Sequence, residues 1–136
     1  MTKKKEDVVW YKVVNQQRRS VIVDRNGTED AVIDALALTY NKGKIVKSKH
    51  GSYGCFCFTD YTEATCFSEY EKGSFIIKVR PVGTIKQVPK RIPVLLFYNL
   101  FYIKENIKKL KLGQLVSASW PVPAHTVCCT AVEVLD

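Results

Sequence analysis

The sequence has no apolar run long enough to cross a bilayer. A membrane-spanning helix needs roughly 18–20 consecutive apolar residues, and the longest candidate, over residues 92–103, is interrupted by Pro93 and Asn99. The first ten residues carry lysines with no apolar segment behind them, which is not the pattern of a secretory signal. We therefore expect a cytoplasmic protein with no membrane partner.

Short motifs that indicate a known chemistry are also missing. The sequence contains no Walker-type phosphate loop and no GxGxxG nucleotide motif. It also has no zinc finger, no basic zipper and no aromatic motif of the kind that binds RNA. These absences exclude the common nucleotide-binding and nucleic-acid-binding modules, so any such activity has to use another arrangement of residues.

The five cysteines lack the spacing of a structural zinc site. Cys55 and Cys57 are separated by one residue, so a strand presents both thiols on one face without the turn that a Cys-x2–4-Cys pair supplies. A catalytic thiol would need His50 or His125 beside it and an electropositive setting, whereas phenylalanines surround these cysteines. We predict no metal site and interpret the cysteines as reduced thiols that pack in the core.

The composition is that of one folded domain. The chain has 136 residues, of which 46% are hydrophobic and 25% charged, and domains most often contain about 100–150 residues. We expect a flexible basic tail over residues 1–7 and a single domain over residues 8–136. The formal charge of +8 favours an anionic partner, although part of it lies in the tail and on the helix expected near residues 104–111.

The first half of the domain reads mainly as strands. Residues 8–15 are rich in valine and aromatics, and residues 20–24 follow as the second strand of a hairpin. A short helix is expected from Thr28 to Ala35. Residues 35–40 and 45–49 then read as two strands joined by a glycine-containing turn, before a glycine-flanked loop at residues 50–54.

The second half alternates strands with two helices. Residues 55–58 read as a buried strand, and a helix begins at Thr59 or Asp60 and ends near residues 72–73. A strand interrupted by Pro81 and Gly83 follows, with Pro81 better suited to an edge or a bulge than to a central ladder. Residues 125–135 form the closing strand. The core-facing residues predicted for the two helices are Ala64, Phe67 and Tyr70 in the first and Leu96, Leu100, Ile103, Ile107 and Leu110 in the second, which Gly113 closes.

Together these elements predict an α+β domain with a mostly antiparallel sheet and two main helices. Residues 53–67, "YGCFCFTDYTEATCF", resemble the glycine, aromatic strand and alanine-containing helix of ADP-ribosyltransferase-like folds. In that family the strand and helix flank the nicotinamide end of NAD. The overall layout, from "WYKVV" to "HTVCCTAVEVL", also resembles small uncharacterised bacteriophage proteins.

The catalytic residues of the transferase families are not all matched. The class with a histidine on an early strand has Trp10 and Tyr11 in that position here. For the arginine class, Arg18 or Arg19 corresponds to the arginine, but its Ser-Thr-Ser motif is missing, and Glu69 and Glu71 form "EYE" in place of its acidic motif. The resemblance therefore implies a degenerate ADP-ribosyltransferase-like fold.

We expect non-enzymatic binding and sequestration of a phosphate-bearing, nucleotide-like ligand, with no cofactor. Arginine can hold phosphate with two hydrogen bonds and aromatic rings can stack on a base. In a phage protein this would counter a host immune signal. The residues predicted to bind the ligand are Arg18, Arg19, Ser20, Tyr40, Lys44, Tyr53, Phe58, Tyr61 and Arg80.

Two alternatives remain open on the sequence. The first, which the resemblance implies, is an ADP-ribosyltransferase-like enzyme that uses NAD, with Tyr53 or Tyr61 stacking on nicotinamide and Glu69 or Glu71 as the acid. The second is nucleic-acid binding through charge alone. In addition, an aromatic cluster in the second helix covers more than one buried face requires and predicts a homo-oligomer. This cluster consists of Phe97, Tyr98, Phe101 and Tyr102.

Overall fold

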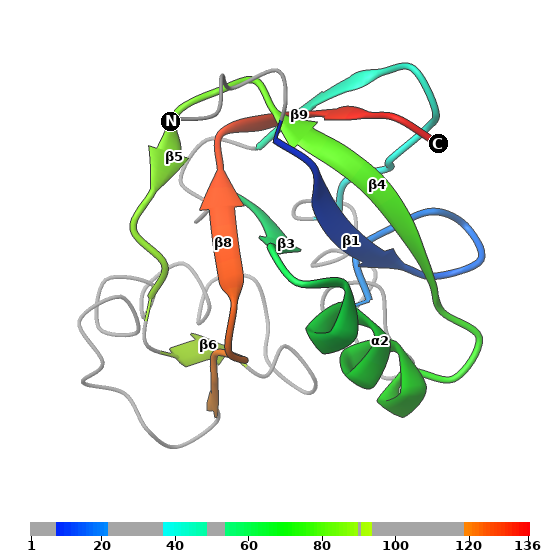
Figure 1. The fold of residues 1–136 in the computed structure, drawn as a ribbon, viewed down its shortest axis with the longest axis vertical. Helices are drawn as coiled ribbons and strands as arrows, with labels where there is room; N and C mark the ends of the chain where they lie inside the picture. Colours follow the sequence, from blue (N-terminus) through cyan, green and yellow to red (C-terminus); the bar gives the residue numbers. More distant parts are fainter. Residues whose placement is uncertain (1–7, 22–36, 49–53, 90, 94–118) are drawn as a thin grey trace.

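A computed structural model of the chain describes residues 8–21, 37–48, 54–89, 91–93 and 119–136. Within these ranges it contains one helix and two antiparallel sheets, a large one and a two-stranded one (Figure 1). The elements are β1 (Trp10–Val14), β2 (Ile45–Lys47), β3 (Cys55–Phe58), α2 (Tyr61–Tyr70), β4 (Phe75–Pro81), β5 (Ile85–Lys86), β6 (Arg91–Pro93), β7 (Ser119–Pro121), β8 (Thr126–Cys129) and β9 (Ala131–Val134).

The large sheet has seven strands in the order β2-β9-β4-β1-β3-β8-β5, and every pairing in it is antiparallel. β8 and β9 follow one another in the chain, with a single residue between them. They therefore connect the two sides of this strand order. In the circuit from β1 through β4, β9, β8 and β3 back to β1, neighbouring strands are hydrogen-bonded at every step except from β9 to β8, where the chain itself makes the connection. The sheet is a small barrel, and the α+β class with a mostly antiparallel sheet is confirmed.

The barrel turns a corner where β4 passes into β5 and β8 into β9. Pro81 pairs with Val132 and Ile85 with Cys129, so three residues on one strand, 82–84, oppose two on the other. This is a bulge, which bends a strand and increases its twist. A Cβ on Gly83 would lie 2.2 Å from Thr130 Oγ1, so the close approach at the corner requires glycine.

The interior of the barrel is lined by alternate residues of each strand. Its core consists of Trp10, Val14, Tyr40, Val46, Cys55, Cys57, Ile77, Val79, Cys129, Val132 and Val134. The inward positions change from Cys129 to Val132, an interval of three, so the alternation of inward and outward side chains is interrupted at the corner between β8 and β9. Lys12 lies between Trp10 and Val14 on the inward face of β1 and is buried.

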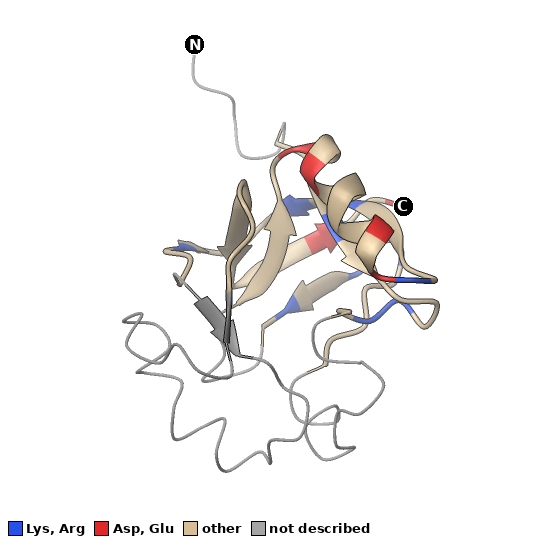
Figure 2. Ribbon diagram, turned by 90° about the horizontal axis from the view of Figure 1, so that it is seen from below, with Lys and Arg blue, Asp and Glu red and all other residues tan. Residues whose placement is uncertain are grey.

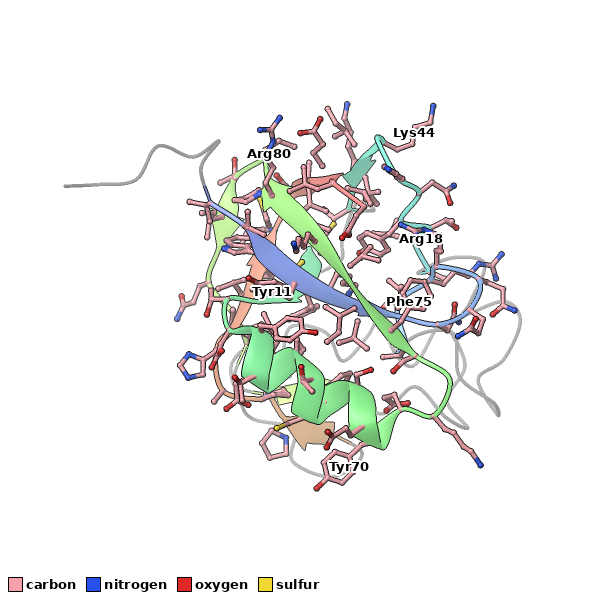
Figure 3. All side chains as sticks on the ribbon, turned by 45° about the vertical axis from the view of Figure 1, so that its right-hand side comes forward. Tyr11, Arg18, Lys44, Tyr70, Phe75 and Arg80 are labelled. Atoms are coloured by element: carbon pink, nitrogen blue, oxygen red, sulfur yellow. The ribbon has the colours of Figure 1, made fainter. Side chains whose placement is uncertain are left out.

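Helix α2 packs on the outer face of β1, with smaller contacts to β4 and β3. Asp60 is its N-cap, and Oδ1 of this residue accepts a hydrogen bond of 3.0 Å from Thr62 N. Ala64 and Phe67 contact the sheet as predicted. The prediction for Tyr70 is wrong, because this side chain is 89% exposed and points away from the sheet at the end of α2 (Figure 3).

The strand predictions have mixed outcomes. The strands predicted at 8–15, 45–49 and 55–58 are present as β1, β2 and β3. The strand predicted over 35–40 is wrong in its described part, where only Thr39 forms a bridge, to Arg19. Pro81 lies beyond the last pair of β1 and β4, which fits its predicted place at an edge or bulge.

Several predictions lie outside the described residues. These are the tail over residues 1–7, the short helix from Thr28 to Ala35, most of the strand over 20–24, the loop over 50–54 except Gly54, and the second main helix with its aromatic cluster, Phe97, Tyr98, Phe101 and Tyr102. Within the described part α2 is the one helix.

Candidate functional site

Five of the predicted ligand-binding residues lie on or beside two turns at one end of the barrel. The first turn follows β1 and is organised by Asn15, whose side-chain Oδ1 accepts hydrogen bonds of 3.0 Å from both Gln17 N and Arg19 N. Arg18 has a φ of 62° in this turn, a left-handed conformation that non-glycine residues rarely adopt. The turn therefore presents its two arginines in one fixed backbone arrangement.

The second turn precedes β2 and is bonded to the first. Tyr40 N donates to Arg18 O at 2.8 Å, and Thr39 forms an antiparallel bridge with Arg19. Lys44 N donates to Asn41 O at 3.1 Å and closes the turn that carries Lys42 and Lys44, both exposed. We call the two turns, with Arg18, Arg19, Lys42 and Lys44, the cationic turns.

The Arg18 side chain joins the cationic turns to the end of the chain. Its Nε donates to Tyr40 O at 2.7 Å and its Nη2 donates to Asp136 O at 2.5 Å. The guanidinium carbon lies 5.8 Å from the centroid of the Phe75 ring, and Figure 3 shows the two side chains beside each other. A guanidinium has five N–H donors, so donors remain beyond these two contacts.

A second polar group lies inside the barrel beneath these turns. Lys12 Nζ donates to Phe56 O at 2.7 Å and lies 5.1 Å from the centroid of the Tyr40 ring. Burial lowers the pKa of the Lys12 amine from its ordinary value of 10.5. The Cys55 and Cys57 thiols face the same space, and the Cys55 thiol donates to Val46 O at 3.8 Å.

Burial acts in the opposite direction on the acidic groups of this cluster. It raises the pKa of the Tyr40 hydroxyl well above 10.0, and it raises the pKa of the Cys57 thiol to about 12. The pKa of Cys55 is also raised, mainly by burial. At neutral pH the thiols are therefore protonated, which excludes a nucleophilic thiolate at these two positions.

The cysteines are packing residues with one exception. Cys55, Cys57, Cys128 and Cys129 are buried, all five cysteines are free thiols, and Cys66 alone is exposed. Cys129 belongs to the barrel core, whereas the Cys128 thiol points toward the carbonyl oxygens of Lys86 and Gln87 at 3.5 and 3.7 Å. The predicted core packing of the four strand cysteines is confirmed.

Apart from Arg18, Arg19 and Lys44, none of the predicted ligand-binding residues that the structure describes offers an accessible side chain at the cationic turns. Tyr40 is 1% exposed and Phe58 is 7% exposed, so both rings are enclosed by core neighbours. Tyr61 is exposed at the start of α2, where its ring contacts Tyr11 edge to face at 5.4 Å between centroids. Arg80 forms an ion pair with Glu133. Ser20 is half-buried and bridges to Val14, and Tyr53 lies outside the described residues.

Tyr61 does not converge with either glutamate of the enzyme alternative, and the other proposed tyrosine, Tyr53, lies outside the described residues. Tyr61 begins α2, Glu69 lies in its last turn, and Glu71 is its C-cap. At 1.5 Å rise per residue, the eight to ten residues between them correspond to about 12–15 Å along the helix. One nicotinamide ribose cannot contact both ends, so Tyr61 and either glutamate do not form a single catalytic site.

Acidic residues gather on α2, whereas the strands carry residues of both signs, including the Arg80 and Glu133 pair. In Figure 2, several acidic residues lie along α2, and most lysines and arginines lie on strands and turns. No helix in the described ranges combines the length and the apolar character of a bilayer span.

Comparisons of the chain with protein-family models, with curated proteins and with solved structures find no match. The resemblance to ADP-ribosyltransferase-like folds and to phage proteins stays a prediction.

Sequence reasoning missed Lys12, Lys42 and Phe75. Lys42 shares a turn with Lys44 and could have been found from the glycine-containing turn itself. Phe75 and Lys12 had no local signal, because their positions beside Arg18 and Tyr40 depend on contacts between segments distant in the chain.

Proposed function

We propose that the protein binds a phosphate-bearing, nucleotide-like ligand without turning it over, and that the phosphate contacts the cationic turns. The observation that carries this proposal is the pair of bonds between Arg18 and Tyr40, one between main-chain atoms at 2.8 Å and one from the guanidinium at 2.7 Å. These bonds hold two basic segments together that are some twenty residues apart in the sequence. The cationic residues are thereby positioned before a ligand arrives.

The chemistry of the cationic turns suits a phosphate oxygen. Hydrogen bonds between a charged donor and an anionic acceptor are roughly twice as strong as neutral ones. Arg18 is fixed at Nε and Nη2 by main-chain oxygens, so it loses little side-chain freedom on binding. Lys42 and Lys44 extend into solvent from the neighbouring turn, where they can adjust to the position of the anion.

The absence of turnover is supported by the environment of the candidate catalytic groups. The buried Cys57 thiol, with its pKa raised to about 12, is not a nucleophile near neutral pH. Tyr61 and the pair Glu69 and Glu71 lie at opposite ends of α2. A protein that binds tightly and does not react acts by sequestration. The resemblance to small phage proteins suggests withdrawal of a host immune signalling nucleotide as the use.

Isothermal titration calorimetry with ATP, ADP, cyclic AMP, NAD and inorganic phosphate tests this proposal. The informative variant is Lys42→Gln with Lys44→Gln, which removes two exposed charges from the cationic turns. The matched control is Lys72→Gln with Lys86→Gln, which removes two exposed charges elsewhere. We expect one nucleotide to bind and its affinity to fall at least about tenfold in the first variant only, since each charge-assisted hydrogen bond contributes about 1.5–3 kcal/mol.

Three outcomes would contradict the proposal. If no phosphate-bearing compound binds, or if the control pair weakens binding as much as the test pair, the cationic turns are not the site. If incubation with NAD releases nicotinamide and Glu69→Gln or Glu71→Gln abolishes the release, the protein is an enzyme. If duplex DNA binds with an affinity that falls roughly 1000-fold or more between 50 and 200 mM salt, charge-driven nucleic-acid binding is the better description.

A further inference from the structure

Three potential metal ligands face one another at the beginning of α2. Asp60, Glu63 and His125 each offer one ligand atom, and these atoms all lie within 4.8 Å of one another. Asp60 and Glu63 are half-buried and His125 is exposed. The group combines two carboxylate oxygens with one imidazole nitrogen, and it is separate from the cationic turns and from the proposed nucleotide binding.

Two distant segments of the chain build this group. Asp60 and Glu63 come from the N-cap and first turn of α2, whereas His125 directly precedes β8. Thr59 ties the segments together, because its main-chain N donates to His125 O at 2.9 Å and its Oγ1 donates to the same oxygen at 3.4 Å. The position of the imidazole beside the two carboxylates is therefore determined by the fold and not by sequence proximity.

Capping of the helix does not account for all three side chains. Asp60 Oδ1 accepts the hydrogen bond from Thr62 N, which leaves its second carboxylate oxygen for another contact. Among the described residues, the Glu63 carboxylate and the His125 imidazole have neither a hydrogen bond nor an ion pair, to each other or to Asp60. Three ligand atoms thus converge without contacting one another directly, and two carboxylates at this separation repel unless a cation lies near them.

We propose that Asp60, Glu63 and His125 bind one divalent transition-metal ion, Zn²⁺ or Mn²⁺. Metal–ligand bonds of about 2.0–2.2 Å place the donors of a tetrahedral centre about 3.4 Å apart. The three atoms reach that spacing from within 4.8 Å by rotation of partly exposed side chains. The imidazole disfavours Ca²⁺ and Mg²⁺, which prefer oxygen ligands, and the lack of a thiolate or thioether disfavours Cu(I).

Three protein ligands leave at least one coordination position for water or a ligand. A structural zinc site uses four protein ligands, whereas sites that bind or activate another molecule keep an open position. The proposed ion therefore adds a Lewis-acidic position on the face of the domain that carries the acidic residues of α2 (Figure 2). The ligand class expected there is a small oxygen donor, water or a carboxylate, bound to the metal.

The test is metal titration of the full chain in a Cys66→Ser background, which removes the one exposed thiol. Zn²⁺ binding is followed by calorimetry, and Mn²⁺ binding by loss of the electron paramagnetic resonance signal of the free ion. The three test variants preserve local structure. Asp60→Asn keeps an N-cap, Glu63→Gln keeps the helical side-chain length, and His125→Asn suits the φ of 61° at that position.

We expect one ion per chain and at least about a tenfold loss of affinity in each variant, while Glu69→Gln, on the same helix, and His50→Gln leave the affinity unchanged. Circular dichroism of every variant verifies folding, and a variant that does not fold leaves the other two to decide. Absence of binding by the background protein overturns the proposal. So does binding that survives all three substitutions, or binding that is lost in His50→Gln.

Discussion

Lys12 Nζ donates a hydrogen bond of 2.7 Å to the main-chain oxygen of Phe56 inside the barrel. The side chain of Lys12 is only 5% exposed, and among the described residues it has no carboxylate within ion-pair distance. A buried amine that is not paired with a carboxylate favours its neutral form, because the charged form loses its hydration. Protonation of the Lys12 amine is therefore coupled to folding of the chain.

Replacing Lys12 with Met should remove a pH dependence of stability. The pKa of Lys12 is lowered in the folded chain from 10.5, so below pH 10.5 the unfolded chain binds a proton that the folded chain binds less readily. The contribution of Lys12 to stability is present above pH 10.5 and declines as the pH falls toward the folded pKa. As the pH rises toward 10.5, the free energy of unfolding of the native protein, measured with urea, should rise relative to that of Lys12→Met, by at most about 1.4 kcal/mol per pH unit.

The matched control is Lys44→Met, at an exposed position, which should keep the pH dependence of the native protein. The thiols act in the opposite direction above pH 9, and comparison of the two lysine variants removes the contribution that they share. The raised pKa of Cys57, about 12, gives a contribution that is present below pH 9.0 and is lost as the pH rises toward 12. Equal slopes for Lys12→Met and Lys44→Met would show that folding does not lower the pKa of Lys12.

The thiols should separate into one reactive and four protected groups. Cys66 is exposed, whereas the other four cysteines are buried, and thiol reagents attack the accessible thiolate. With 5,5′-dithiobis(2-nitrobenzoic acid) at pH 8, one thiol should react quickly and four only after addition of guanidinium chloride. The variant Cys66→Ser should have no fast phase. Two or more fast thiols in the native protein would contradict the packing of β3 or β8.

Local signals in the sequence identified α2 and its buried face, and they identified β1 as a strand but not the burial of Lys12 on it. An N-cap aspartate followed by Ala64 and Phe67 at helical spacing identifies a helix and its buried face, and both residues contact the sheet. In β1 a lysine at position 12 normally marks the solvent face of a strand. Here both faces are covered, one by the barrel interior and the other by α2, so the charge pattern indicates the wrong face.

The candidate site was predictable only in part for a similar reason. Adjacent arginines followed by a serine identified the first cationic turn, and a glycine-containing turn identified the second. Their contact through Arg18 and Tyr40 depends on how the chain returns after residues 22–36, which no local pattern determines. Tyr40 was expected to line a ligand pocket as an aromatic residue near a loop. Its side chain is instead buried, because the barrel encloses it.

A methyl group at Gly83 should weaken the corner of the barrel. Its Cβ would lie 2.2 Å from Thr130 Oγ1 and 2.6 Å from the main-chain N of Ala131. We expect Gly83→Ala to lower the free energy of unfolding by roughly 2–4 kcal/mol, within the range seen for overpacking and backbone displacement. Because one of the two clashes involves main chain, adding Thr130→Ala should not restore stability.

Gly43→Ala is the control for this prediction, measured by the same urea unfolding. Gly43 has a φ of +80° but has open space around its Cβ position. The substitution should therefore cost only the roughly 1–2 kcal/mol of a left-handed alanine. A smaller loss for Gly83→Ala than for Gly43→Ala would show that the corner has room for a side chain.

Comparison of Arg18→Ala with Arg18→Gly should separate the backbone and side-chain contributions of this residue. Both substitutions remove the hydrogen bonds from the guanidinium to Tyr40 O and Asp136 O, at a net cost of about 1 kcal/mol each. Alanine also has to adopt the φ of 62°, which costs it roughly 1–2 kcal/mol more than glycine. Urea unfolding should therefore rank the stabilities as native, then Arg18→Gly, then Arg18→Ala. If alanine is as stable as glycine, the first cationic turn does not hold its left-handed conformation in solution, and Arg18 is not positioned in advance for an anion.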